Sequence, residues 1–496
     1  MPHGTPGFPR MHRKFVLTRP MTDSIMASLT CRIRSPRAAE SSWHLDSKAS
    51  TSLFTVPEVA MNRRPQVCRL GIFAAVLALS LAAAGQDVLF WHPHLRPHAQ
   101  LPSSPSHPAV SLGDWSQVAQ LVQAPLRFHN FTGFGTSVAI DGDTIVVADV
   151  PETGRSVAYV FVKPASGWRS VLATAALDLD PSAVGVFPTV AVSGDTIVVG
   201  MSGFEGSPGA AYVFVKPSDG WVDMTPTATL TPRGTSSWFG LSVSIDGDTV
   251  VVGEPDVDFH TGAACVFVKP AGGWVNMTPT AVLTASDNHI YDSLGTSVSV
   301  SGGTIVAGAP QNYRSTGKAY VYVESSGGWT DMTQTAELTG SHAQPGWAVG
   351  AAVSVSGDTV VVGAPEDYLI PSLPGEAYVF VKPAGGWTNM TETARLVAAD
   401  RLNGDGLGIS IQLKGKTLAV GAGFRTRGPN VEAGAVYVFE QPSSGWKDMA
   451  SSTVLTSSGE RRLVELGWSV GLLGNTIIAG APLINFEGMA FIFQRP

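Results

Sequence analysis

The chain has 496 residues, a formal net charge of -7 at pH 7, 14% charged residues and 54 glycines. This length is sufficient for a large buried core, and the glycine content indicates many turns. The charge balance argues against a nucleic-acid-binding surface, which needs clustered Lys and Arg to displace phosphate counterions, so we expect no nucleic-acid partner.

The first 112 residues contain a targeting segment and a linker. We interpret residues 61–86 as a secretory signal peptide, because three arginines lie near the start of an apolar run that ends in alanines. The run has about 15 residues, fewer than the roughly 20 of a spanning helix, so membrane attachment is expected only if this segment stays uncleaved. Residues 1–60 are then a disordered extension or a mis-assigned start, and residues 87–112 a Pro- and His-rich linker.

Cysteine usage agrees with an exported protein that needs no internal disulfide. Of Cys31, Cys68 and Cys265, only Cys265 follows the signal segment. Cys265 occupies a position that is Tyr in other copies of the repeat described next, such as Tyr159. We therefore predict a buried side chain and not a nucleophile.

From residue 113 onward a single phrase recurs, as in "FGLSVSIDGDTVVVGEP" from Phe239 and "VGAAVSVSGDTVVVGAP" from Val349. Seven copies, 52 to 59 residues apart, indicate a repeat architecture. The threonines that align the copies are Thr144, Thr196, Thr249, Thr304, Thr359, Thr417 and Thr476.

Each copy predicts four short strands. A half-buried strand such as "SVSI" (242–245) meets a Gly turn typical of a two-residue hairpin, and an apolar strand such as "TVVVGAP" (359–365) follows. A loop of variable length then leads to a third strand such as "AYVFVKP" (377–383). The fourth strand begins at a tryptophan, as in "WTNMTETARL" (387–396), and we assign the aligned tryptophans to packing between repeats.

Seven four-stranded antiparallel units predict an all-β fold, a seven-bladed β-propeller over residues 113–496. The last copy ends at its third strand, "GMAFIFQRP" (488–496), while "GDWSQVAQLV" (113–122) resembles an orphan fourth strand. We therefore expect the N-terminal strand to complete the C-terminal blade and close the ring, which hides both edges.

The recurring words resemble a known family. "FG" at Phe239-Gly240 and "GAP" at residues 308–310, 363–365 and 480–482 are similar to the FG-GAP repeats of integrin α-subunit propellers, and the fuller wording resembles secreted bacterial FG-GAP repeat proteins. This resemblance implies an adhesion or protein-binding role.

Integrin-type repeats often carry a Ca²⁺ loop between the first two strands, and the sequence departs from that pattern. The loop is reduced here to turns such as "SGD", and a single carboxylate in a turn favours a turn over a cation site. "DRLNGDG" (400–406) offers the oxygen ligands Asp400, Asn403 and Asp405, but it lies between a fourth and a first strand. We therefore expect no cofactor, with this stretch as the remaining cation candidate.

In an up-and-down blade, the loops between strands two and three and between four and one emerge on the same face, which we call the long-loop face. These loops differ between copies, as expected of a binding surface on a rigid scaffold. Their aromatic and charged residues suit contact with protein or glycan, although several aromatics are equally expected to pack onto the blades. The candidate ligand-binding residues are Trp238, Asp258, Phe259, Tyr313, Trp347, Tyr368, Phe424 and Arg425.

Catalytic motifs give little support to an enzyme. The chain has no G-x-S-x-G elbow and no H-E-x-x-H motif. Four histidines are predicted on the long-loop face: His129, His260, His289 and His342. Three of them, together with Asp258 or Asp287, would form a hypothetical metal site. The sequence favours a secreted or cell-surface, non-catalytic binding and adhesion module; the alternatives are a polysaccharide-active enzyme and a structural envelope protein.

Overall fold

The computed structural model describes most of the repeat region. The predicted signal peptide and linker lie outside the described residues. Among the residues that are described, no helix has the length and apolar character needed to cross a membrane. The described ranges are 115–122, 133–150, 156–179, 185–203, 209–236, 238–287, 289–310, 316–365, 374–426, 432–457, 464–482 and 488–496.

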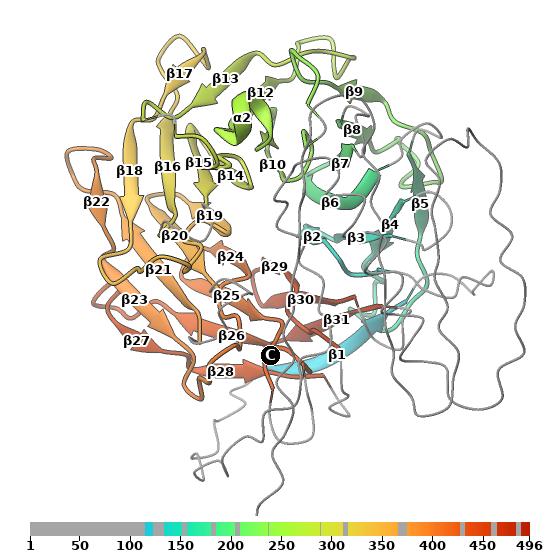
Figure 1. Ribbon diagram of the computed structural model, residues 1–496. Helices are drawn as coiled ribbons and strands as arrows, with labels where there is room; N and C mark the ends of the chain where they lie inside the picture. The colour runs from blue at the N-terminus through green and yellow to red at the C-terminus, as the bar shows by residue number, and fades with distance from the viewer. Residues whose placement is uncertain are drawn as a thin grey trace, which may run out of the picture. The chain divides into compact units, whose positions relative to one another are not determined.

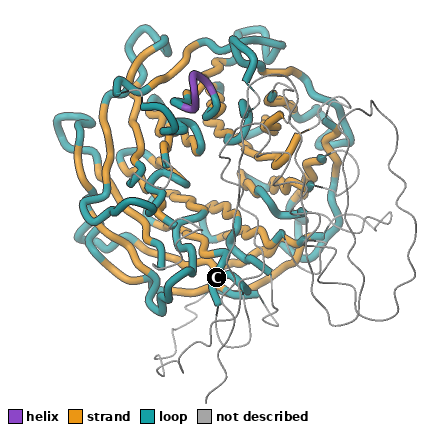
Figure 2. The backbone as a smooth tube through the Cα atoms, in the orientation of Figure 1, coloured by secondary structure: helices purple, strands orange, loops and turns teal. Residues whose placement is uncertain are grey.

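Seven β-sheets are arranged as blades around one axis, as predicted (Figure 1). In six blades the strands follow chain order from the axis outward, and blade 7 differs in its outermost strand. The first strands of neighbouring blades contact one another around the ring. Strands account for nearly all regular structure, with one short helix-like turn, α2 (Val257–His260), over blade 3, in which Asp258 and Phe259 have non-helical backbone angles (Figure 2).

The strands are numbered in chain order. Blades 1 and 2 contain β2 (Val138–Asp141), β3 (Thr144–Asp149), β4 (Val157–Val162), β5 (Ala175–Asp178), β6 (Gly185–Ser193), β7 (Thr196–Gly203), β8 (Ala210–Val215) and β9 (Ala228–Leu230). Blades 3 and 4 contain β10 (Val243–Asp246), β11 (Thr249–Glu254), β12 (Ala263–Val268), β13 (Ala281–Thr284), β14 (Ser297–Ser301), β15 (Thr304–Ala309), β16 (Lys318–Val323) and β18 (Ala336–Thr339). Blades 5 and 6 contain β19 (Ala352–Ser356), β20 (Thr359–Ala364), β21 (Glu376–Val381), β23 (Ala394–Val397), β24 (Ser410–Lys414), β25 (Thr417–Ala422), β26 (Ala435–Glu440) and β28 (Thr453–Leu455).

The ring closes through blade 7, in the way that the sequence predicted. This blade contains β29 (Ser469–Leu473), β30 (Thr476–Ala481) and β31 (Met489–Gln494) from the C-terminal end of the chain. Its outer strand is β1 (Ser116–Leu121), which pairs antiparallel with β31 and has a register shift between Gln117 and Ala119. The shift accommodates a fourth strand that is about three residues shorter than its counterparts.

Two kinds of glycine explain the repeated phrase. In the hairpin between the first two strands, glycines such as Gly302 have positive φ, as a tight turn requires. The glycine that ends the second strand instead faces the next blade, where a Cβ atom on Gly253 would come closer than 3.0 Å to the Gly295 carbonyl oxygen. The same close approach joins Gly200 to Gly240, Gly253 to Gly295, Gly308 to Gly350, Gly363 to Gly408, Gly421 to Gly467 and Gly480 to Gly135.

In these six contacts, the "GAP" glycine of one blade lies directly against the backbone of the "FG" glycine of the next. The seventh interface, between blades 1 and 2, has Ala148 and Phe187 at the two positions. There the first strand of blade 2, β6, is nine residues long and has a register shift between Val186 and Thr189. A lengthened strand thus replaces the glycine contact at this interface.

The fourth segment of each copy differs from the prediction of a single strand. Its first part pairs in parallel with the outer strand of the preceding blade, as β17 (Met332–Thr333) does with β13, and only its last part joins its own blade. β22 (Met390–Thr391) and β27 (Met449–Ala450) repeat this arrangement, so three sheets have five strands. The segment therefore crosses from one blade to the next and covers an outer edge.

A side chain two residues after six of the seven aligned tryptophans strengthens this crossing. Asp331 Oδ1 accepts the backbone N–H of Val282 in the preceding blade at 2.8 Å, and Asn276 Oδ1 accepts that of Thr229 at 2.8 Å. We call this bond the blade clasp. The acceptors around the ring are Ser170, Asp223, Asn276, Asp331, Asn389 and Asp448.

The core is divided into seven clusters, each lying between two blades. In one of them, Trp387 packs with Val306 of blade 4 and Val353 of blade 5. All seven aligned tryptophans are buried, which confirms their predicted packing role. Burial of apolar surface between neighbours is the main favourable term, so each blade is stable only beside two others.

Candidate functional site

Two loops on the long-loop face join above blades 3 and 4. One connects β11 to β12 and includes α2, and the other enters blade 4 through residues 289–294. The backbone N–H of Tyr291 donates to the carbonyl of Phe259 at 3.3 Å, and that of Ser293 donates to His260 at 2.8 Å. The His260 and Tyr291 rings stack, with centroids 5.5 Å apart. The two loops therefore form one unit.

The backbone of this unit is strained. Eight non-glycine residues of the described chain have positive φ, and five of them lie here. They are Asp258, Phe259, His260, Tyr291 and Ser293. L-residues in the left-handed region cost about 1–3 kcal/mol each and persist where the surrounding structure holds them, often at binding sites.

The same unit exposes large apolar side chains. Phe259 is 84% exposed, Ile290 61% and Tyr291 48%. We call these three residues the apolar knob. Exposed apolar groups that adjoin one another indicate an interaction surface, whereas single ones are ordinary. The sequence predicted Phe259 as a contact residue but did not identify Ile290 or Tyr291.

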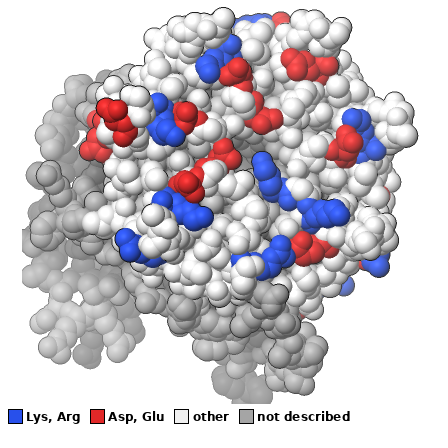
Figure 3. Space-filling model, turned by 180° about the vertical axis from the view of Figure 1, so that it is seen from behind, with Lys and Arg blue, Asp and Glu red and all other residues white. Residues whose placement is uncertain are grey.

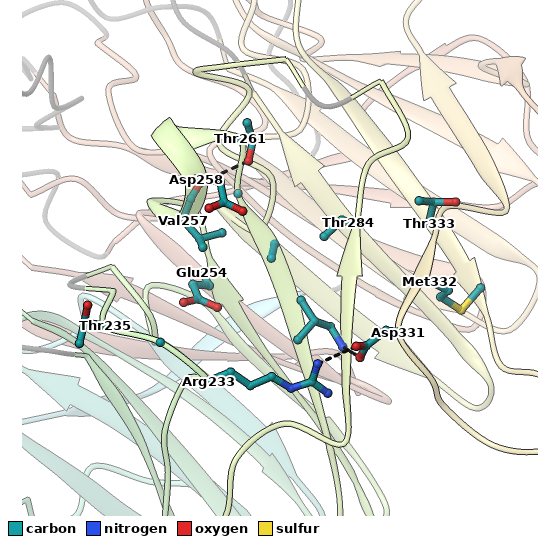
Figure 4. Close-up of a pocket in the computed structure, with 14 residues that line it drawn as sticks. Arg233, Thr235, Glu254, Val257, Asp258, Thr261, Thr284, Asp331, Met332 and Thr333 are labelled. Carbon is teal, nitrogen blue, oxygen red and sulfur yellow. Dashed lines mark hydrogen bonds and ion pairs between the residues drawn. The ribbon is translucent and has the colours of Figure 1, made fainter.

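A pocket with a volume of about 600 Å³ opens beside the knob (Figure 4). Three blades line it: the loop around Arg233 that leaves blade 2, the ends of β11 and β12, and the crossing segment 331–333 of blade 4. Arg233 Nη1 donates to Asp331 Oδ2 at 2.6 Å across one wall, and this hydrogen bond lowers the pKa of Asp331. The predicted contact residue Asp258 lies on the opposite wall.

Glu254 brings a buried carboxylate into this pocket. It is 5% exposed and stands where most copies have the alanine of "GAP". Its Oε2 accepts the thiol of Cys265 at 3.2 Å. Burial is the main cause that raises the pKa of Glu254, and the Asp258 and Asp256 carboxylates raise it further. Cys265 is buried as predicted, and burial raises the pKa of its thiol well above the usual value.

Several other predicted contact residues are packed into the fold. Trp347 is buried, and Phe424 is buried with its ring edge-on to Trp468 at 6.1 Å. Arg425 Nη2 pairs with Asp400 at 3.0 Å, and its Nε bonds the Tyr437 hydroxyl. These three residues pack onto blade tops, the arrangement that the sequence left equally open for several aromatics, and their contact with a ligand stays a prediction.

The remaining contact candidates do not gather at the knob. Trp238 is half-buried, on the turn that enters blade 3. Tyr313 and Tyr368 lie outside the described residues. Asp258 and Phe259 are thus the two predicted contact residues that the structure brings together on an exposed surface.

The cation candidate at residues 400–406 is already occupied by protein contacts. Tyr437 donates its hydroxyl to Asp400 Oδ1 at 2.6 Å, Arg425 takes the other oxygen, and Asp405 Oδ2 accepts the N–H of Leu402. Asn403 is exposed. These partners do not fit a cation site. The described residues contain no group of three His, Cys, Asp or Glu side chains placed to hold a metal, and His129 lies outside them.

Three buried carboxylates lack partners for oxygen atoms in the described structure. They are Asp149 at the end of β3, Asp292 next to the knob, and Glu465 at the entry to blade 7. Burial raises the pKa of Asp149 to about 7, of Asp292 to about 6 and of Glu465 to about 8. Each is therefore protonated more readily than an exposed carboxyl group.

Charge is dispersed elsewhere. On the face shown in Figure 3, acidic and basic side chains lie side by side in small groups on a mostly uncharged surface. Lys269 Nζ, for example, pairs with Asp248 Oδ1 at 3.1 Å across the short-turn end of blade 3. Such exposed pairs contribute little stability and do not form a continuous basic patch.

Comparison with known proteins identifies the repeat. The FG-GAP repeat family matches residues 226–267, 277–322, 332–380 and 390–439. No curated protein matches the chain significantly. The four matched stretches run from the outer strand of blade 2 to the third strand of blade 6, and the same strand order and glycine contacts continue through blade 7 to blade 1.

Proposed function

Because the chain is an FG-GAP repeat β-propeller protein, we propose that it is a non-catalytic binding and adhesion module, secreted or displayed at the cell surface. Its ligand is an extracellular protein or glycan, and the contact surface is the long-loop face above blades 3 and 4. The observation that carries this proposal is the apolar knob, where exposed side chains larger than glycine stand on strained backbone.

The knob is costly to the isolated protein. Exposed Phe259 gains little from burial, and its left-handed backbone is unfavourable for any residue other than glycine. A ligand that covers the knob would bury its apolar surface, and each Å² buried would contribute about 25 cal/mol to the free energy of binding. The knob also adjoins a pocket with charged walls, which supplies polar contacts beside the apolar ones.

The extracytoplasmic location rests on residues 61–86, whose basic start and short apolar run are typical of a signal peptide. Cleavage would release the propeller, and retention would tether it to the membrane. Neither state changes the surface proposed to bind.

The test is capture of ligands from envelope and matrix fractions of the organism that produces the protein. The full chain is compared with the double variant Phe259→Asn, Tyr291→Asn, because Asn tolerates positive φ better than other non-glycine residues. The control is Leu172→Asn, which removes an apolar side chain that is 57% exposed on the outer segment of blade 1.

We expect the parent and the control to retain a partner that the double variant loses, although the melting temperature of the double variant is no lower than that of the parent. Equal capture by the double variant would remove the knob from the binding surface. If the parent cleaves a glycan and the Asp258→Asn variant does not, the protein is a polysaccharide-active enzyme and the binding-only proposal is wrong.

A further inference from the structure

The lining of the pocket beside the knob suits a small polar ligand. Four threonines, Thr235, Thr261, Thr284 and Thr333, line the pocket together with the apolar residues Val257, Val282 and Met332, and the Thr261 hydroxyl also donates to the carbonyl of Val257. The pocket volume of about 600 Å³ lies within the roughly 300–1,000 Å³ of small-molecule sites. A mixture of hydroxyl, charged and apolar groups suits a sugar ring, which presents both hydroxyls and C–H faces.

The pocket also has two carboxyl groups that no cation pairs with in the described structure, Glu254 and Asp258. Arg233 is already paired with Asp331. In the described structure no ion pair neutralises Glu254 or Asp258, which face the remaining space. Glu254 is almost fully buried, and its support comes from neutral groups: its Oε2 accepts a hydrogen bond from the Cys265 thiol, a weak donor, and the Ser236 hydroxyl also lowers its pKa. A buried carboxylate with this little support favours a cationic guest.

The apolar knob stands beside the pocket. Phe259 follows Asp258 directly, and Tyr291 is tied to Phe259 by a backbone hydrogen bond. Aromatic rings of this kind present an apolar face with little conformational freedom to lose, which suits stacking on a sugar. The adjoining charges and rings would contact opposite sides of one residue of a glycan chain.

We propose that this pocket binds a sugar ring that carries a protonated amine, so that the ligand is a glycan containing amino sugars. The inference rests on the proposed binding function and names its ligand class. The ammonium group lies between Glu254 and Asp258, the ring hydroxyls bond the threonines, and one C–H face packs on the knob. An acidic sugar is excluded by repulsion from the same two carboxylates.

The experiment compares three glycosides that share one ring structure and differ in charge: one cationic, one neutral and one anionic. Binding of the methyl glycosides of glucosamine, glucose and glucuronic acid to the full chain is measured by ligand-observed NMR at about pH 6, where the amine is protonated. We expect the glucosaminide to bind about tenfold more tightly than the glucoside, because a charged hydrogen bond contributes more than a neutral one. The glucuronide should not bind measurably. n-Propylamine, an amine without the ring, should bind at least tenfold more weakly than the glucosaminide.

Two variants and one control locate the site. Asp258→Asn keeps a residue that accepts left-handed φ, and Glu254→Gln keeps the side-chain shape; each should weaken glucosaminide binding about fivefold to tenfold and leave glucoside binding within about twofold. Asp248→Asn removes a carboxylate from the hairpin end of blade 3, away from the pocket, and should change neither.

Equal binding of the three glycosides, no binding of any, or propylamine binding as tight as the glucosaminide would overturn the inference. If the glycosides fail while capture of an envelope partner still depends on Phe259, the proposed function stands without the sugar. If capture fails as well, both proposals are wrong.

Discussion

Between blades the backbone approaches itself so closely that only glycine fits, whereas above blades 3 and 4 bulky residues occupy a conformation that glycine would adopt freely. Gly253 and Gly295 are examples of the first region, and Phe259 and Tyr291 of the second. The blade interfaces repeat because each must satisfy the same steric condition. The knob does not repeat, and its residues are unfavourable for stability. The steric condition accounts for the residues at the interfaces, and the unrepeated, strained residues of the knob support the proposal that binding selects them.

The largest expected effect is at a blade interface. Gly253→Ala places a Cβ atom against the Ser242 hydroxyl and, more closely, against the Gly295 carbonyl of the next blade, which is backbone and cannot move aside as a flexible side chain could. We expect a loss of about 3 kcal/mol or more in the free energy of unfolding, measured by urea denaturation. The control is Gly302→Ala in a hairpin turn with open space around it, where only the positive φ opposes the substitution and about 1–2 kcal/mol is lost. Equal losses would mean that the close approach is not what restricts this position.

The buried carboxylates make the stability of the fold depend on pH. Burial raises the pKa of Glu465 from 4.5 to about 8, so the folded state binds a proton that the unfolded state releases between these values. The stability that this proton supplies is complete below about pH 4.5 and is lost as the pH rises to about 8, at about 1.4 kcal/mol per pH unit. Thermal melting from pH 5 to pH 8 should show a decline that Glu465→Gln makes shallower. If the melting temperature of the variant falls with pH as steeply as that of the parent, the decline is due to other groups, such as Asp149.

A smaller effect is expected at the blade clasp. Asn276→Ala removes the acceptor for the backbone N–H of Thr229 and should lower the free energy of unfolding by about 1 kcal/mol. Asn276→Asp keeps an acceptor of the kind that Asp223 and Asp331 provide in other copies, so its urea midpoint should match that of the parent. If Ala and Asp behave alike, the clasp does not contribute to stability.

The smallest expected effect has the opposite sign. Phe259→Gly should raise the free energy of unfolding by about 0.5–1 kcal/mol, because relief of the left-handed strain exceeds the added entropy of glycine in the unfolded chain. Little apolar burial is lost, since the ring is exposed. Phe259→Ala keeps the strain and should be close to neutral. Destabilisation by glycine would show that the ring itself supports the fold.

Much of the fold could be predicted from the sequence because the periodicity of strands and turns is local and repeats seven times. Closure through β1 followed from the missing fourth strand of the last copy and from Trp115, which is buried as in the other blades. The division of the fourth segment between two blades was missed. Its cause, the pairing of Met332 with Leu283 across blades, is a contact with a different copy and leaves no local pattern.

The candidate site was predicted only in part. Phe259 and Asp258 were found because their loop is long and variable, but exposure cannot be inferred for Trp347 or Phe424 from the same criterion. The signals that were overlooked are departures from the repeat: Glu254 in place of the alanine of "GAP", and the apolar pair Ile290-Tyr291 inside a polar loop. A position that breaks a repeated rule without a packing reason marks a site better than loop length does.

We propose that the knob above blades 3 and 4 contacts a ligand outside the chain. The most direct test replaces Phe259 with a photoreactive benzoylphenylalanine, irradiates the protein with the native envelope, and compares the products with those of the same residue at exposed Leu172. We expect crosslinks to a foreign protein or glycan from position 259 and none from position 172. Crosslinks from position 172 alone, or an unmodified chain at position 259, would contradict it.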